Sequence, residues 1–183
     1  GGDTLSFNNA LRTVLRHDPD VIMIGEMRDP ESISIALTAA ETGHLVMSTL
    51  HTTSAADTIN RIIDVYPEHQ QQQIRTQLAN NLVAVISQTL IPRKDGTGRI
   101  AVMEILNVTD AIAAMIRDNK IHLIQSAIQT GKQQGMMSLD QELARLTAKG
   151  IIGEVDALDK CLDKQEFYRF LTQLGGVPTG GMS

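Results

Sequence analysis

The stretch VIMIGE, residues 21–26, is the part of the 183-residue sequence that decides the fold. Its first four residues form an unbroken apolar run, which is typical of a strand buried on both faces in a parallel sheet. Gly25 and the acid Glu26 follow directly. A carboxylate is therefore predicted at the far end of this strand.

A second apolar run, residues 45–50, follows after a segment with helical spacing. Asp29 and Pro30 are a favourable helix start, because aspartate accepts hydrogen bonds from free amides and proline has no amide hydrogen to leave unpaired. Gly43 is a suitable stop before the second strand. Strand, helix and strand at this spacing favour a right-handed parallel crossover, so the ends of both strands are predicted at one edge of the sheet.

Further elements are predicted on both sides of this unit. Upstream, residues 7–16 have the spacing of an amphipathic helix. Downstream, a helix starting at Ser54 precedes a long helix, whose apolar positions continue as far as Leu90. The turn at residues 94–98 predicts a hairpin, in which residues 99–106 pair back on residues near 88–93. Helical patterns then cover residues 110–118, 121–130, 138–149 and 160–174.

Composition narrows the class of protein. Sixteen Lys and Arg against 21 Asp and Glu give a net charge of −5, so bulk charge gives no support for nucleic-acid binding. The single cysteine, Cys161, allows neither an internal disulfide nor a cysteine-based zinc cage, and it suits a reducing compartment. No apolar run approaches the about 18 residues that span a bilayer. We expect a cytoplasmic protein that binds no nucleic acid.

The glutamate at the end of the first strand has two interpretations. Ligands of open parallel sheets bind beyond the carboxyl ends of the strands, and many nucleotide hydrolases present a carboxylate there that orients water and helps to hold Mg²⁺. Alternatively, Glu26 is only a carboxylate at the entry of the next helix, and Arg28 with Asp29 is a local surface pair. The pattern alone leaves both interpretations open.

Two histidines lie near the second strand. His44 and His51 are seven residues apart, and this odd separation points them to opposite faces of an extended strand, which argues against a metal site shared by the pair. Thr49 and His51 share a face, so the imidazole could reach a phosphate or a neighbouring carboxylate. A purely structural histidine is the alternative.

The 183 residues contain no Gly-x-x-x-x-Gly-Lys-Ser/Thr motif, the usual phosphate-binding loop. The nearest dipeptide, Gly131-Lys132, is followed by Gln133 and lies among predicted helices. An acid at a strand end without a loop for phosphates indicates either a different kind of site or a site of which half is missing.

Two motifs carry a resemblance to a known family. Residues 16–29, RHDPDVIMIGEMRD, resemble the Walker B segment of secretion ATPases, and residues 42–52, TGHLVMSTLHT, resemble their His box. These proteins are the hexameric motors of type IV pili and type II secretion. The resemblance runs from Asp3 to about Ile152.

Within this family the sequence is most similar to the retraction motors of the PilT type. Extension and secretion motors generally carry a tetracysteine zinc loop after the long helix, whereas residues 87–100 pass through a short turn without a cysteine. Residues 111–118, AIAAMIRD, stand where retraction motors have the signature AIRNLIRE, and Ala113 and Ala114 depart from it.

The resemblance implies an α/β fold, the second half of a RecA-like ATPase, with a mostly parallel sheet, helices and a hairpin. Residues 1–107 would form this later half, residues 108–174 a small helical C-terminal unit, and residues 175–183 a flexible tail. The Walker A segment, the Asp box and an N-terminal PAS-like domain would precede Gly1. On this expectation the chain alone is inactive.

The resemblance also implies ATP and Mg²⁺ as cofactors. Glu26 would be the catalytic carboxylate, which activates the attacking water and helps to position Mg²⁺ through water. His51 would contact the terminal phosphate, and His44 would support the same box. The expected nucleotide-binding residues come from the two motifs: Gly25, Glu26, Arg28, His44, Thr49 and His51.

The implied function is that of a homo-hexameric motor, which hydrolyses ATP to drive type IV pilus retraction and hence twitching motility. Its partners would be an inner-membrane pilus platform protein and the pilin machinery, and these would bring the cytoplasmic motor to the inner membrane. A type II secretion or pilus-extension ATPase of the same family is one alternative. A non-catalytic docking module is another.

Overall fold

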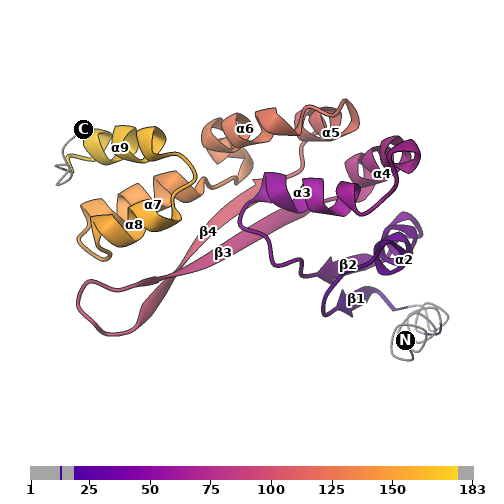
Figure 1. Cartoon of the computed structure of the whole chain (residues 1–183), viewed down its shortest axis with the longest axis horizontal. Helices are drawn as coiled ribbons and strands as arrows, with labels where there is room; N and C mark the ends of the chain where they lie inside the picture. Colours follow the sequence, from indigo (N-terminus) through magenta and orange to yellow (C-terminus); the bar gives the residue numbers. More distant parts are fainter. Residues whose placement is uncertain (1–12, 14–18, 177–183) are drawn as a thin grey trace. The chain divides into compact units, whose positions relative to one another are not determined.

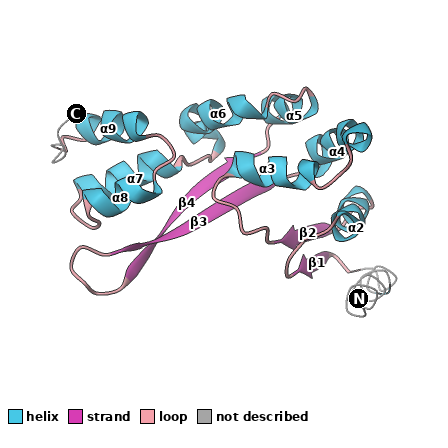
Figure 2. Cartoon of the chain, in the orientation of Figure 1, coloured by secondary structure: helices cyan, strands magenta, loops and turns pink. Residues whose placement is uncertain are grey.

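The computed structural model describes Thr13 and residues 19–176, which fall into two compact units (Figures 1 and 2). The described part of the first unit comprises residues 19–52, 56–83 and 110–121, and the second comprises residues 53–55, 84–109 and 122–176. The helix predicted at residues 7–16 and most of the predicted tail lie outside the described residues. Both units mix helices with a two-stranded sheet.

A parallel pair of strands is the sheet of the first unit. Strand β1 (Val21–Ile24) pairs with strand β2 (Leu45–Ser48), and helix α2 (Pro30–Glu41) connects them (Figure 1). The register places the last residue of β1, Ile24, opposite the last residue of β2, Ser48. The predicted parallel arrangement is confirmed, and the two strands end side by side.

The start of α2 follows the sequence prediction. Asp29 is the N-cap, and its Oδ1 atom accepts a hydrogen bond from the Ser32 amide over 2.9 Å, with Pro30 as the first helical residue. The helix ends at Glu41, and Gly43 then adopts a left-handed φ of 100° that suits glycine. The N-cap at Asp29 fixes where the segment between β1 and α2 ends.

Among the described residues, a helix covers one face of the sheet of the first unit. Ile22 and Ile24 are buried against Ala36 and Ala39 of α2. On the opposite face the apolar side chains of both strands are about half exposed or more: Val21, Met23, Leu45 and Met47. The prediction that the first strand is buried on both faces is therefore wrong, because Val21 and Met23 lie on the face opposite α2 and are at least half exposed.

The described part of the first unit contains three further helices. Helix α3 (Ala55–Asp64) begins directly after Ser54, as predicted. Helix α4 (Glu68–Asn81) packs against helix α5 (Asp110–Arg117), and the Gln72 side chain donates a hydrogen bond to the Arg117 carbonyl over 3.1 Å. Each helix buries a line of isoleucine or leucine side chains: Ile59, Ile62, Ile63, Ile74, Leu78, Ile112 and Ile116.

The prediction that the long helix continues to Leu90 is wrong. Helix α4 ends at Asn81, and strand β3 (Ala84–Pro92) pairs antiparallel with strand β4 (Arg99–Asn107) along its whole length. From residue 84 the burial alternates, with Val85 buried and Ile86 64% exposed, which is the period of a strand. The predicted hairpin is confirmed, and it begins four residues earlier than expected.

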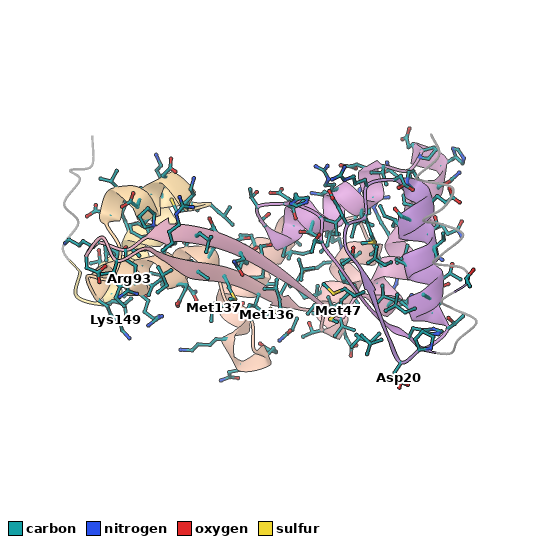
Figure 3. The ribbon with its side chains drawn as sticks, turned by 90° about the horizontal axis from the view of Figure 1, so that it is seen from below. Asp20, Met47, Arg93, Met136, Met137 and Lys149 are labelled. Atoms are coloured by element: carbon teal, nitrogen blue, oxygen red, sulfur yellow. The ribbon has the colours of Figure 1, made fainter. Side chains whose placement is uncertain are left out.

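The turn end of the hairpin is tied to the chain after helix α7 (Leu139–Ala148). Within the turn, the Arg93 amide donates to the Gly98 carbonyl over 2.9 Å. Arg93 also pairs with Ile152, and the Lys94 amide donates to the Ile151 carbonyl over 2.9 Å. Figure 3 labels Arg93 and Lys149 at this end of the second unit. The hairpin and the later helices thus form one body.

The described part of the second unit also contains α6 (Ile124–Thr130), α8 (Glu154–Lys160) and α9 (Lys164–Gln173). Short 3-10 turns lie at Ile121–Leu123, where the two units meet in the sequence, and at Gly131–Gln134. The single helix predicted at residues 160–174 is α9 alone, and α8 was not predicted. One core joins the hairpin, α7, α8 and α9, with these central side chains: Ile91, Val102, Leu143, Ala157 and Phe167. Contacts therefore group the hairpin with the later helices, a division different from the predicted boundary at residue 107.

No helix in the described part of the chain is long and apolar enough to cross a membrane.

A buried carboxylate holds two of these helices together. Asp140 of α7 is fully buried, and its two carboxyl oxygens accept hydrogen bonds from the amides of Leu162 (2.8 Å) and Asp163 (3.0 Å), directly before α9. Burial raises the pKa of Asp140 to about 6; the two amides oppose this rise, and the charges of Asp163 and Glu104 add to it. Folding therefore extends the pH range in which Asp140 is neutral up to about 6, and above that pH the buried carboxylate is ionised.

We predict that Asp140 makes folding stability depend on pH between about 4 and 7. Since the folded pKa is raised above the unfolded one, the stabilisation by Asp140 is complete below about pH 4 and is lost as the pH rises through 6. Denaturant unfolding of the chain and of Asp140→Asn should show the stability advantage of the unmodified chain shrinking by about 2–3 kcal/mol across this range. Asp118→Asn, at an exposed carboxylate, is the control. A constant difference, or one that grows with pH, would contradict the assignment.

Candidate functional site

The candidate site lies where β1 and β2 end. Beyond the last paired residues, the Thr49 hydroxyl donates a hydrogen bond to the Gly25 carbonyl over 2.5 Å, and the Met27 amide donates to the Thr49 carbonyl over 3.2 Å. These two bonds join the segment that carries Glu26 to the segment that carries His51. The parallel register brings both segments to one edge.

Three side chains meet at this edge. The Oε2 atom of Glu26 accepts a hydrogen bond from Nη2 of Arg28 over 2.5 Å, and its Oε1 atom lies 3.3 Å from Nε2 of His51. The Glu26 side chain is 27% exposed, whereas those of Arg28 and His51 are about three-quarters exposed. The structure thus brings together the acid and the imidazole that the sequence placed at the same edge.

The surroundings of Glu26 favour its ionised form. The hydrogen bond from Arg28 is the main cause that lowers the pKa of Glu26; desolvation opposes it, and the charges of Arg28 and His51 lower the pKa further. The same hydrogen bond raises the pKa of Arg28. A carboxylate has about four lone-pair positions, so Glu26 can accept further hydrogen bonds beside those of its two neighbours.

The backbone of His51 is in an uncommon conformation. Its φ of 45° lies in the left-handed region, which only a few per cent of non-glycine residues adopt, with Asn, Asp and His enriched among them. Such conformations cost about 1–3 kcal/mol and cluster at functional sites, where the surrounding structure holds them. On the far side of His51, the Thr52 hydroxyl lies 2.6 Å from that of Thr58 in α3 and anchors the segment. The sequence did not predict a role for Thr52, because only its position directly after His51 indicates one.

His44 lies at the opposite end of β2 from His51. Its Nδ1 atom lies 3.0 Å from the Ala39 carbonyl oxygen and 3.1 Å from the Thr42 hydroxyl, at the end of α2. The structure therefore does not bring His44 together with Glu26. Its contacts hold the turn from which β2 starts.

The site offers one carboxylate to a metal ion. Among the described residues, no group of three or more His, Cys, Asp or Glu side chains is arranged to hold a cation. Mg²⁺ commonly uses only one or two carboxylates, with waters and substrate phosphates as its other ligands. The ionised Glu26 suits that partial role. The space beside Gly25 is open, since a Cβ atom at this position would meet no other atom within 4 Å.

Comparison with known proteins gives the family. The model of the type II/IV secretion system protein family matches residues 2–155. The Neisseria gonorrhoeae twitching motility protein is 55% identical over 149 residues, which cover 81% of this chain and 40% of that protein. The Pseudomonas aeruginosa type IV pilus retraction ATPase PilT is 53% identical over 165 residues, which cover 90% of this chain and 48% of that protein.

Solved structures agree with this result. A crystal structure of the pilus retraction motor PilT with bound ADP matches with a TM-score of 0.82 and 46% identity, over 92% of this chain and 47% of that one. The Legionella pneumophila ATPase DotB matches with a TM-score of 0.72 and 30% identity, over 83% of this chain and 41% of that one. The predicted α/β fold, the second half of a RecA-like ATPase, is confirmed.

The chain spans less than half the length of the curated relatives above. The matched residues nevertheless include both strands, the edge that carries Glu26 and His51, and the hairpin. By its match over residues 2–155 and by its close relatives, the chain belongs to the type II/IV secretion system protein family.

Proposed function

We propose that the full-length protein is a motor ATPase that drives type IV pilus retraction, and that the edge of β1 and β2 is part of its ATP site. The observation that carries the proposal is the ionised Glu26 held against His51 just beyond two parallel strand ends. Ligands of open parallel sheets bind at such edges. Relatives that are 53–55% identical are named a pilus retraction ATPase and a twitching motility protein.

In this proposal Glu26 is the catalytic base of the reaction. Its carboxylate accepts a hydrogen bond from the attacking water and orients it, and a lowered pKa keeps the carboxylate available for this at neutral pH. His51 donates from Nε2, either to Glu26 or to a terminal phosphate oxygen. Arg28 adds a positive charge that favours an anionic ligand at this edge.

The residues present fit a Mg²⁺–ATP complex in part. Glu26 would hold the cation through water, and the nucleotide would approach along the open space at Gly25. When bound, Mg²⁺ supplies charge neutralisation on the phosphate oxygens. We propose only a supporting role for His44, since its contacts lie at the start of β2.

The assembly is part of the same proposal. The full-length protein would be a homo-hexamer in the cytoplasm, docked on an inner-membrane platform protein and acting on the pilin machinery. Retraction is favoured over extension or secretion because both relatives above are named for retraction or twitching and match most of this chain. Restoring retraction in cells that lack their retraction motor is the test of direction.

Replacing the proposed base tests the enzymatic assignment. Glu26→Gln in the full-length protein keeps the shape of the side chain but removes its charge and its ability to take a proton. We expect ATP turnover to fall by about 100-fold or more, as is usual for the loss of a general base. Steady-state phosphate release measures this.

Glu68→Gln is the matched control, because Glu68 is an exposed glutamate at the start of α4. It should leave turnover unchanged. If Glu26→Gln turns over ATP at the normal rate, the edge is not catalytic, and a non-catalytic docking module becomes the better interpretation of this chain.

The imidazole can be tested without disturbing its backbone. His51→Asn is the suitable variant, because asparagine tolerates the left-handed φ of 45° that this position requires while its shorter side chain cannot make the contact of the imidazole with Glu26. We expect turnover in the full-length protein to fall about 10-fold or more, with the unfolding temperature unchanged. Normal turnover in His51→Asn would exclude the imidazole from the reaction.

A further inference from the structure

Thr49 has its only hydroxyl proton committed to the protein. A threonine hydroxyl carries one O–H donor, and in the structure this donor points to the Gly25 carbonyl oxygen over 2.5 Å. A phosphate oxygen is an acceptor, so it needs a donor from its partner. While the bond to Gly25 is intact, Thr49 therefore has no proton to offer a phosphate.

The bond has a structural consequence at the site. Gly25 directly precedes Glu26, and Thr49 stands two residues before His51. The Thr49 carbonyl in addition accepts from the Met27 amide, directly after Glu26. Thr49 thus holds the backbone on both sides of Glu26, once through its side chain and once through its own backbone.

This clamp is needed because the sheet ladder ends before the site. The last paired residues are Ile24 and Ser48, so Glu26 and His51 stand on segments that the strands no longer fix. Thr49 and His51 are both exposed, and the His51 side chain is 73% exposed, so neither belongs to the core of the unit. His51 also adopts a left-handed backbone that the free chain would seldom populate. The hydrogen bonds of Thr49 with Gly25 and Met27 are the contacts that link the two backbone segments beyond the strand ends.

We propose that Thr49 is a positioning residue and not a nucleotide ligand: its hydroxyl, bound to the Gly25 carbonyl, sets the distance between Glu26 and His51. This inference rests on the proposed function, since it assigns a role within the same site. It replaces the expectation from the sequence that Thr49 binds the nucleotide. The hydroxyl, not the methyl group, is the part that matters.

Two variants of the full-length protein test this. Thr49→Val has nearly the same shape without the hydroxyl, and Thr49→Ser keeps the hydroxyl without the methyl group. We expect Thr49→Val to lower kcat about 10-fold or more, with affinity for methylanthraniloyl-ADP changed less than two-fold, both with Mg²⁺ and in EDTA. Thr49→Ser should match the unmodified protein in both measurements.

Other results would overturn the inference. If Thr49 binds a phosphate of the nucleotide, Thr49→Val should bind methylanthraniloyl-ADP more weakly. If Thr49 binds the cation, this loss should occur only with Mg²⁺. If Thr49 has no role, neither kcat nor affinity should change. If Thr49→Val does not fold, Thr49→Ala makes the same comparison with Thr49→Ser. Glu26→Gln is measured in parallel: normal turnover there defeats the proposed function, whereas loss there with normal kcat in Thr49→Val defeats only this inference.

Discussion

The parallel register of β1 and β2 is the constraint on which the site depends. It places Ile24 opposite Ser48, so that both strands end together and the residues that follow them share one edge. A shift by one residue would offset the two strand ends by about 3.3 Å, so the segments that carry Glu26 and His51 would no longer start side by side. Ile22 and Ile24, buried against α2, hold this register from one face, so the packing of a small core decides the geometry of an exposed site.

Two carboxylates show how far the surroundings control the same chemical group. Glu26 lies at the surface beside Arg28, and the hydrogen bond from this cation lowers its pKa. Asp140 is buried between α7 and the segment before α9. Burial raises its pKa to about 6, and the charge of Glu104 adds to this rise. The first group is an ionised carboxylate that can accept hydrogen bonds at the surface, whereas the second fastens two helices. Sequence patterns single out Glu26 because it follows an apolar strand, and they contain no comparable signal for Asp140.

Local chemistry explains which parts of the structure could be predicted. The start of α2 depends on Asp29 and Pro30 themselves, and the pairing of β1 with β2 depends on the length of their connection, so both are confirmed. The end of α4 was missed because the apolar residues after Asn81 fit helical and strand spacing alike, and only pairing with β4 decides between them. The hydroxyl bond of Thr49 and the left-handed φ of His51 arise from the meeting of two segments, which no single stretch of sequence records.

The site residues stand on short segments that are fixed at both ends. Between the end of β1 and the cap of α2 lie only four residues, and Asp29 holds the end of this segment by accepting from the Ser32 amide. The segment after β2 is held by Thr49 at one end and by the contact of Thr52 with Thr58 at the other. Loops anchored in this way need no burial to keep their side chains in place. The partly exposed Glu26 and the exposed His51 can therefore keep a defined distance while their polar atoms stay accessible to a ligand.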